Sequence, residues 1–192
     1  YLDSGMSAKT YLMSLSRLAL VQALANGHIS TSGVPNIDYY ISSKHIETDD
    51  SDKYYSERLI RLNRIGNNYD LPISQNSNFN FSSLNFSVND FIIGLPHTVF
   101  KYHPDFDNLL SNILEAIPNA YLFVFEGLKP HETESLLSRW EKNIKYNKDR
   151  IRIFPRVTFE NYISILRNFD IVLDPLYCGM GNTFYQAMAY GI

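Results

Sequence analysis

In the second half of the chain, short apolar runs alternate with longer amphipathic stretches. Four of these runs have the length and composition of buried strands: Asp90–Leu95, Tyr121–Phe125, Ile151–Phe154 and Asp170–Leu173. The stretches between and after them predict helices over about 104–117 and 131–146, after the capping residue Thr158, and from about Thr183. This alternation of strand and helix predicts an α/β protein with a parallel, doubly wound sheet.

Ligands of such sheets bind beyond the carboxyl ends of the strands. Four loops are expected at this edge: Pro96–His103, Glu126–Pro130, Pro155–Thr158 and Pro175–Asn182. We therefore expect the binding residues of this half of the chain on these loops.

The first part of the chain has a similar but less regular pattern. It predicts a helix over about Ala8–Leu18, an apolar run over Leu20–Ala25, and strands over Ile37–Ser42 and Leu59–Leu62. Between the two parts, Ser and Asn fill 10 of the 17 positions of 74–90, a composition that buries little and is typical of a linker. We therefore divide the chain into a first domain over 1–73, a linker over 74–89 and a second domain over 90–192.

Composition and charge exclude several classes of partner. The chain has 192 residues, 17 basic and 20 acidic side chains and a formal net charge of −3, so it lacks the basic field that dominates binding to nucleic acid. No run of about 18 apolar residues predicts insertion into a membrane. Because Cys178 is the single cysteine, a disulfide framework is excluded and the cytoplasm is the expected compartment.

Both ends of the sequence have the character of a fragment. The first residue is Tyr1, and the last residues follow a predicted helix at a point where an α/β protein is expected to enter its next strand. We expect the isolated 192 residues to be marginally stable and inactive.

The clearest candidate for binding chemistry is the loop Cys178–Thr183. Its glycines allow an anion to approach the backbone closely, and the amides of the helix that follows favour negative charge. Lys101 is expected on the same edge of the sheet, where it could neutralise a diphosphate without a metal. A plain turn between a strand and a helix, and a solvated lysine, are the alternative interpretations.

Two further features of the first domain have weaker chemical interpretations. Asp50-Ser51-Asp52 has the Asp-x-Asp form that holds a divalent metal in many sugar-transfer enzymes, but a solvated acidic loop is the favoured interpretation. His28, in the polar loop Gly27–Gly33, could act as an acid or base, and an ordinary turn is the alternative. The five histidines have no i, i+4 spacing, so no bound metal is expected.

Several short motifs follow one another in an order that is typical of a known family. They are 2–6, 9–11, 16–19, Gln22, 27–28, 31–33, 37–43, 55–59, 100–107, 154–156, 170–175 and 181–183. In this order they resemble the bacterial family 41 glycosyltransferases, which are the O-GlcNAc-transferase-like and SPINDLY-like proteins. The resemblance covers nearly the whole chain except the linker and the middle of the helix expected over 131–146.

The resemblance implies a GT-B architecture, in which two Rossmann-like parallel-sheet half-domains face a cleft, here with both halves truncated. It implies metal-independent, inverting transfer of GlcNAc or another hexose from a nucleotide sugar, usually linked to UDP, to a protein or other hydroxyl acceptor. The UDP-sugar is then a co-substrate, and no cofactor or metal is expected.

The resemblance also assigns roles to individual residues. Lys101 matches the lysine that holds the donor diphosphate, and Thr98 or His97 makes the neighbouring polar contact. The other matched positions are Val157 at the nucleobase backbone contact, Tyr162 at the stacking ring, Gly181, Asn182 and Thr183 on the phosphate turn, and Gly27 and His28 facing the donor sugar. Gln186 departs from the family, which usually has an acidic residue there to accept hydrogen bonds from the ribose. A neutral amide is a weaker acceptor than a carboxylate.

Three other functions stay open at this point. A nucleotide-sugar-binding or scaffold protein that has lost catalysis is suggested by Gln186. A SPINDLY-like transferase that uses GDP-fucose shares the same motifs. A Rossmann oxidoreductase is weaker, because neither half has Gly-x-Gly-x-x-Gly followed by an acidic residue about 20 positions later. The sequence identifies neither the acceptor, nor the general base, nor the oligomeric state.

Overall fold

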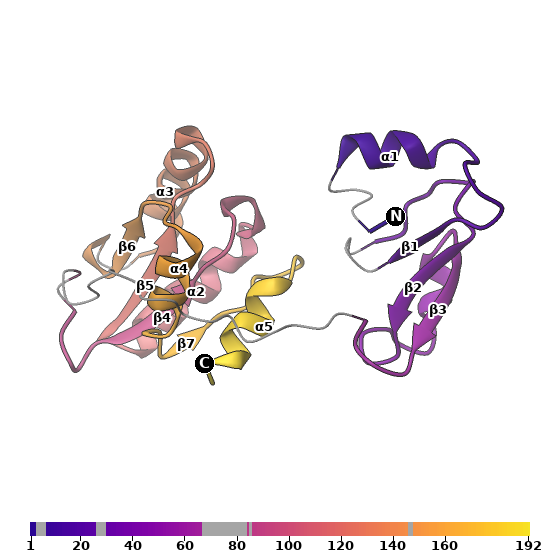
Figure 1. The fold of residues 1–192 in the computed structure, drawn as a ribbon. Helices are drawn as coiled ribbons and strands as arrows, with labels where there is room; N and C mark the ends of the chain where they lie inside the picture. The colour runs from indigo at the N-terminus through magenta and orange to yellow at the C-terminus, as the bar shows by residue number, and fades with distance from the viewer. Residues whose placement is uncertain (3–6, 26–29, 67–83, 85, 146–147) are drawn as a thin grey trace. The chain divides into compact units, whose positions relative to one another are not determined.

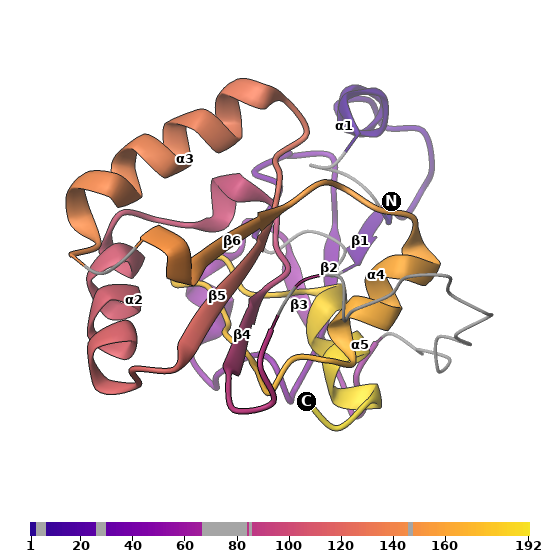
Figure 2. The same cartoon turned by 90° about the vertical axis from the view of Figure 1, so that its left-hand side faces the viewer.

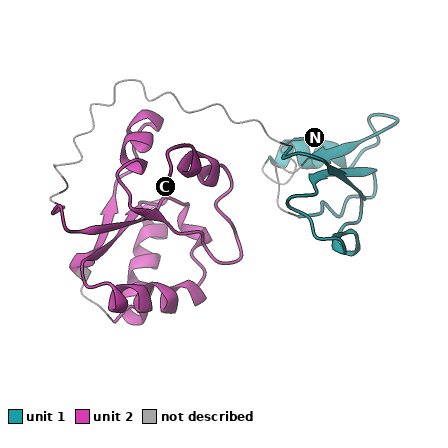
Figure 3. Ribbon diagram, turned by 90° about the horizontal axis from the view of Figure 1, so that it is seen from below, with its two compact units in different colours: residues 1–69 teal, residues 70–192 magenta. Residues whose placement is uncertain are grey.

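The computed structural model describes residues 1–2, 7–25, 30–66, 84, 86–145 and 148–192 (Figure 1). The chain divides into two compact units, residues 1–69 and 70–192, and each contains a parallel sheet (Figure 3). Most of the predicted linker over 74–89 lies outside the described residues. Phe86, near its end, packs edge to face against Tyr121 of the second unit, with ring centroids 5.5 Å apart.

The second unit is built on a four-stranded sheet. Its strands are β4 (Phe91–Leu95), β5 (Ala120–Phe125), β6 (Ile151–Phe154) and β7 (Ile171–Val172), in the order β6-β5-β4-β7. Every pairing is parallel, as predicted. β7 is shorter than the predicted 170–173, because the ladder ends after the Leu173 amide donates to Gly94 O and Pro175 has no amide to extend it.

Helices cover both faces of this sheet, so the doubly wound prediction is confirmed. They are α2 (Asp105–Ala116), α3 (Pro130–Asn143), α4 (Phe159–Leu166) and α5 (Asn182–Ala189). Figure 2 shows α2 and α3 on one side of the sheet and α4 and α5 on the other. The prediction that α3 reaches 146 is wrong, because Ile144 takes an extended conformation and its side chain is buried in the core.

The two faces of the sheet have separate cores because side chains alternate along each strand. Ile93, Leu95, Leu122 and Val124 pack against α2 and α3, whereas Ile92, Phe123 and Phe125 pack against α4 and α5. Gly94 is required on the second face, since a Cβ there would lie 2.1 Å from the Phe169 ring. The segment that follows α4 therefore packs directly on the β4 backbone.

A buried carboxylate ties α2 to α3. Asp107 is 1% exposed and accepts hydrogen bonds from Arg139 (2.9 and 3.0 Å), from the Trp140 indole (2.8 Å) and from the Asn143 amide (2.8 Å). Four donors thus compensate the loss of water around the charge.

The first unit has three parallel strands in the order β1-β2-β3, which are Ala23–Ala25, Tyr39–Ser43 and Arg58–Leu62. α1 (Ala8–Ser14) is shorter than the predicted 8–18, and only the last three residues of the predicted run 20–25 form a strand. The reason is Gln22, whose side chain holds the preceding segment as a turn. Its Oε1 accepts a hydrogen bond from the Leu18 amide, and its Nε2 donates to Ser16 O and Asn36 O.

Within the described part of the chain, none of the helices combines the length and the hydropathy that a membrane span requires.

Candidate functional site

The candidate site lies at the carboxyl edge of the sheet in the second unit, where the chain leaves β4, β6 and β7. β4 is followed by Pro96, His97 and Thr98 and then by the short 3-10 helix η3 (Val99–Lys101). β7 is followed by the Gly-rich loop that leads into α5. Because β4 and β7 are paired neighbours, their loops meet at this edge.

Lys101 is in direct contact with the Gly-rich loop. Its Nζ donates a hydrogen bond of 2.6 Å to the backbone oxygen of Gly179, across 78 residues of sequence. The structure therefore brings together the two features that the sequence singled out for anion binding. Contact of Lys101 with a diphosphate stays a prediction.

The Gly-rich loop turns sharply before α5 begins. Gly181 precedes the helix with φ +63° and ψ −127°, a conformation that favours glycine. It provides no side chain to cap the first helical amides, and the first turn of α5 contains no acidic residue. The Asp174 carboxylate accepts a hydrogen bond of 2.7 Å from the Met180 amide and holds the loop from within. The amides of Asn182 and Thr183 stand at the positive end of the helix dipole.

A pocket of about 310 Å³ lies at the same edge. Its lining is Pro96, His97, Thr98, Phe125, Arg156, Val157, Phe159 and Tyr162. Four of the residues predicted for the nucleotide therefore line one pocket: His97, Thr98, Val157 and Tyr162. Three aromatic rings and one guanidinium give it the mixed character of a ligand site.

His97 is buried, with 6% of its surface exposed, and its Nε2 lies 2.9 Å from Leu173 O. Burial lowers the pKa of His97 to about 4, so the ring is neutral at physiological pH. When Nε2–H donates to Leu173 O, Nδ1 is an acceptor, and it has no partner among the described residues. An acceptor repels phosphate oxygens, so Thr98 fits the predicted anion contact better than His97.

A hydrogen bond connects Tyr162 of α4 with Gln186 of α5. The Tyr162 hydroxyl donates a hydrogen bond of 3.0 Å to Gln186 Oε1, and burial raises the pKa of Tyr162. One lone pair of Gln186 Oε1 is thus used within the protein, and its other lone pair remains for a ligand.

Gly27 and His28 lie outside the described residues. The loop that follows them is held by Glu57, which is 5% exposed and accepts hydrogen bonds from Thr31 Oγ1 (2.6 Å), from the Ser32 amide (2.8 Å) and from the Ser32 hydroxyl. Burial alone would raise the pKa of Glu57, but these hydrogen bonds outweigh it and the pKa is lowered. A charged group therefore anchors this loop to the start of β3.

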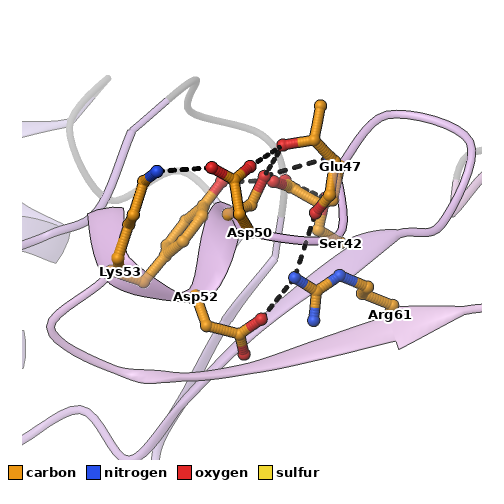
Figure 4. Close-up of polar contacts among 9 residues, drawn as sticks. Ser42, Glu47, Asp50, Asp52, Lys53 and Arg61 are labelled. Atoms are coloured by element: carbon orange, nitrogen blue, oxygen red, sulfur yellow. Dashed lines mark hydrogen bonds and ion pairs between the residues drawn. The ribbon is translucent and has the colours of Figure 1, made fainter.

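The acidic loop at 50–52 has charged partners of its own (Figure 4). Asp50 pairs with Lys53, and Asp52 pairs with Arg61 on β3. The neighbouring Glu47 accepts hydrogen bonds from Ser42 (2.7 Å) and Tyr55 (2.8 Å). Across the described ranges, no group of three or more His, Cys, Asp or Glu side chains could hold a metal ion.

Some residues of the site are missing from the sequence-based prediction. Phe125, Arg156 and Phe159 line the pocket, and Asp174 holds the Gly-rich loop. All four are at or near the carboxyl ends of predicted strands, and Arg156 and Asp174 also lie within the motifs 154–156 and 170–175. Their residue types alone indicate no particular chemistry.

Parallel sheets with a pocket and a Gly-rich turn at the carboxyl edge are typical of the Rossmann-like domains of GT-B glycosyltransferases. Comparison with known proteins agrees with this class. No family model matches the chain. The chain is 28% identical over 191 residues to two proteins named UDP-glucose:protein N-beta-glucosyltransferase, from Actinobacillus pleuropneumoniae serotypes 5b (strain L20) and 7 (strain AP76). Each match covers 98% of this chain and 30% of the relative.

Two solved structures are similar in fold. A variant of the Thermobaculum terrenum O-GlcNAc transferase superposes with a TM-score of 0.73 at 22% identity, over 90% of this chain and 32% of the other. A pneumococcal O-GlcNAc transferase in complex with UDP and GlcNAc has a TM-score of 0.50 at 11% identity, over 90% of this chain and 36% of the other. These likenesses confirm the predicted fold class and the resemblance to O-GlcNAc-transferase-like proteins. The chain spans about a third of the length of these proteins.

Proposed function

We propose that the protein is a metal-independent glycosyltransferase that moves a hexose from a UDP-sugar to a protein acceptor, with inversion at the anomeric carbon. The observation that carries this proposal is the contact of Lys101 with the Gly-rich turn beside the aromatic pocket. The names of the similar proteins support both the nucleotide and the protein acceptor.

The arrangement suits a nucleoside diphosphate in one orientation. The nucleoside would occupy the pocket between Val157 and Tyr162, and the diphosphate would reach the Gly181–Thr183 turn. In the structure, the Lys101 ammonium donates a hydrogen bond to Gly179 O. The ammonium has two further N–H donors, which would form charge-assisted hydrogen bonds with diphosphate oxygens.

Sugar transfer requires stabilisation of the negative charge that develops on the leaving diphosphate. The acceptor hydroxyl or amide nitrogen attacks the anomeric carbon, the bond to the diphosphate oxygen breaks on the opposite side, and the acceptor proton passes to a base. Lys101 and the amides at the start of α5 are preorganised to stabilise the leaving group, and each such donor contributes about 10²- to 10³-fold in rate. His28 stays the candidate base, outside the described residues.

A binding or scaffold protein without catalysis is the second candidate, and one contact favours it. Gln186 replaces an acidic residue and already accepts a hydrogen bond from Tyr162. The lone pair that remains on Gln186 Oε1 belongs to a neutral amide, so a hydrogen bond from the ribose would be weaker than one to a carboxylate. This candidate predicts nucleotide binding without transfer.

A transfer assay with the full-length protein separates the two candidates. The donors are UDP-glucose, UDP-GlcNAc and GDP-fucose, and the acceptors are peptides that contain Asn or Ser and Thr. We expect turnover with a UDP-sugar that Lys101→Ala abolishes and that Lys142→Ala, an exposed lysine of α3, leaves intact. Turnover by Lys101→Ala at the unmutated rate would refute the proposed site. Binding of UDP without turnover on any acceptor would favour the scaffold candidate, and turnover with GDP-fucose alone would refute the UDP assignment.

A further inference from the structure

We propose that Tyr177 is a positioning residue, which holds the Gly-rich loop in the conformation that receives the diphosphate. The inference rests on the proposed function. Tyr177 lies in the loop between β7 and α5, two residues before the carbonyl that Lys101 contacts.

The backbone of Tyr177 has an unfavourable conformation. Its φ is +68°, and it is the only residue other than glycine with positive φ in the described part of the chain. A bulky residue in this region is strained, and such strain persists only where the surroundings hold it. Burial does not hold Tyr177, because the residue is 75% exposed.

One hydrogen bond and one ring contact, at and just before the start of α2, hold the Tyr177 side chain instead. Its hydroxyl donates a hydrogen bond of 2.8 Å to Asp105 Oδ2, and its ring stands edge-on to His103, with centroids 4.8 Å apart at 82°. Asp105 is itself fixed, since its amide donates a hydrogen bond of 3.2 Å to His103 Nδ1. As the first residue of α2, its carboxylate also lies at the favourable end of a helix dipole.

The loop is therefore tied twice to the segment 101–105, by Tyr177 to Asp105 and by Gly179 to Lys101. A diphosphate would compete with Gly179 O for the three N–H donors of the Lys101 ammonium and so weaken the second tie. The Tyr177–Asp105 hydrogen bond uses neither Lys101 nor the backbone amides of the turn, so it holds the loop equally well when the diphosphate is bound. Tyr177 consequently acts on the phosphate-binding state, and less on the nucleoside pocket.

This difference distinguishes positioning from a general structural role. The nucleoside uridine would contact the pocket but has no phosphate to reach the loop. Loss of the Tyr177 hydroxyl should therefore weaken the binding of UDP and leave the binding of uridine unchanged. A loss of overall stability would weaken both ligands.

The test is calorimetric titration of UDP and of uridine into the full-length protein and its variants. Tyr177→Phe keeps the ring and removes the hydrogen bond, and Tyr177→Gly removes the side chain and relieves the strain at positive φ. Tyr54→Phe, which removes a hydroxyl from an exposed tyrosine of the first unit, is the matched control.

We expect the Kd of UDP to rise about five-fold in Tyr177→Phe, the size of an ordinary hydrogen bond, because solvent weakens this exposed contact with a carboxylate. Tyr177→Gly should raise the Kd of UDP at least as much, and Tyr54→Phe should leave it unchanged. The Kd of uridine should stay the same in all three variants.

Three results would overturn the positioning role: an equal loss of affinity for UDP and uridine in Tyr177→Phe, an unchanged Kd of UDP in that variant, or tighter binding of UDP in Tyr177→Gly. If the unmutated protein binds UDP no better than uridine, the proposed diphosphate site itself fails and the role of Tyr177 fails with it. The two failures are thus separate results of one experiment.

Discussion

Replacement of Asp107 by Asn is predicted to be strongly destabilising, although the two side chains have nearly the same shape. Asp107 Oδ1 accepts from the Trp140 indole and one Arg139 nitrogen, and Oδ2 accepts from Arg139 Nε and the Asn143 amide. An Asn side chain has one oxygen for these four donors, and its NH₂ group would face two of them. The substitution therefore leaves donors unpaired at a position that is 1% exposed.

The cost follows from this count. Each buried donor without a partner costs roughly 1–3 kcal/mol, and removal of one partner of a buried ion pair costs about 3–5 kcal/mol. Arg139 has a side chain that is 29% exposed and can regain water, so the lower end applies. We expect the free energy of unfolding of the second unit to fall by about 3 kcal/mol.

Urea unfolding followed by tryptophan fluorescence measures this change directly. Trp140 is the single tryptophan of these 192 residues and it contacts Asp107, so in a chain of this sequence the signal reports on the second unit. With an m-value of about 2 kcal/mol/M, the midpoint should fall by about 1.5 M. Glu115→Gln, an exposed acid on the same helix, is the control and should leave the midpoint unchanged. A midpoint for Asp107→Asn equal to that of the control would refute the reasoning.

Two other predictions concern pH and metals. Burial holds the pKa of His97 at about 4, below its ordinary value of about 6.5. The unfolded chain therefore binds a proton first as the pH falls, and stability that is complete above pH 6.5 is lost toward pH 4, by about 3 kcal/mol. Urea midpoints at pH 7 and pH 4.5 should differ less in His97→Gln than in the unmutated protein, and an equal difference would contradict this prediction. Because Asp50 and Asp52 pair with Lys53 and Arg61, EDTA and the double substitution of both acids to Ala should leave sugar transfer intact. A loss of turnover that Mg²⁺ or Mn²⁺ restores would show that the proposed metal-independent mechanism is wrong.

The parallel sheet of the second unit was predictable because each of its strands is short, apolar and followed by a helix signal. Thr158 caps α4 as expected, with its side chain accepting a hydrogen bond from the Asn161 amide. The meeting of Lys101 with the Gly-rich loop followed from topology alone, since both come after strands of one parallel sheet. Local pattern and one topological rule together predict these features.

Features that depend on long-range side-chain contacts were not predictable. Asp107 has the sequence position of an exposed residue near the start of a helix, and it is buried because donors 32 to 36 positions later surround it. Leu20 and Val21 have the pattern of a strand, but the side-chain bonds of Gln22 turn the chain and leave both residues exposed. Tyr177 gives no local signal, because positive φ is expected of glycine.

The central claim is that Lys101 and the Gly-rich turn bind the diphosphate of a UDP-sugar. Calorimetric titration of the full-length protein with UDP tests it most directly, with GDP as the competing nucleotide and Lys142→Ala as the control variant. We predict that UDP binds more tightly than GDP. We also predict that Lys101→Ala raises the Kd of UDP by about ten- to a hundred-fold, the size of a charge-assisted hydrogen bond. The same UDP affinity in Lys101→Ala as in Lys142→Ala would contradict the claim.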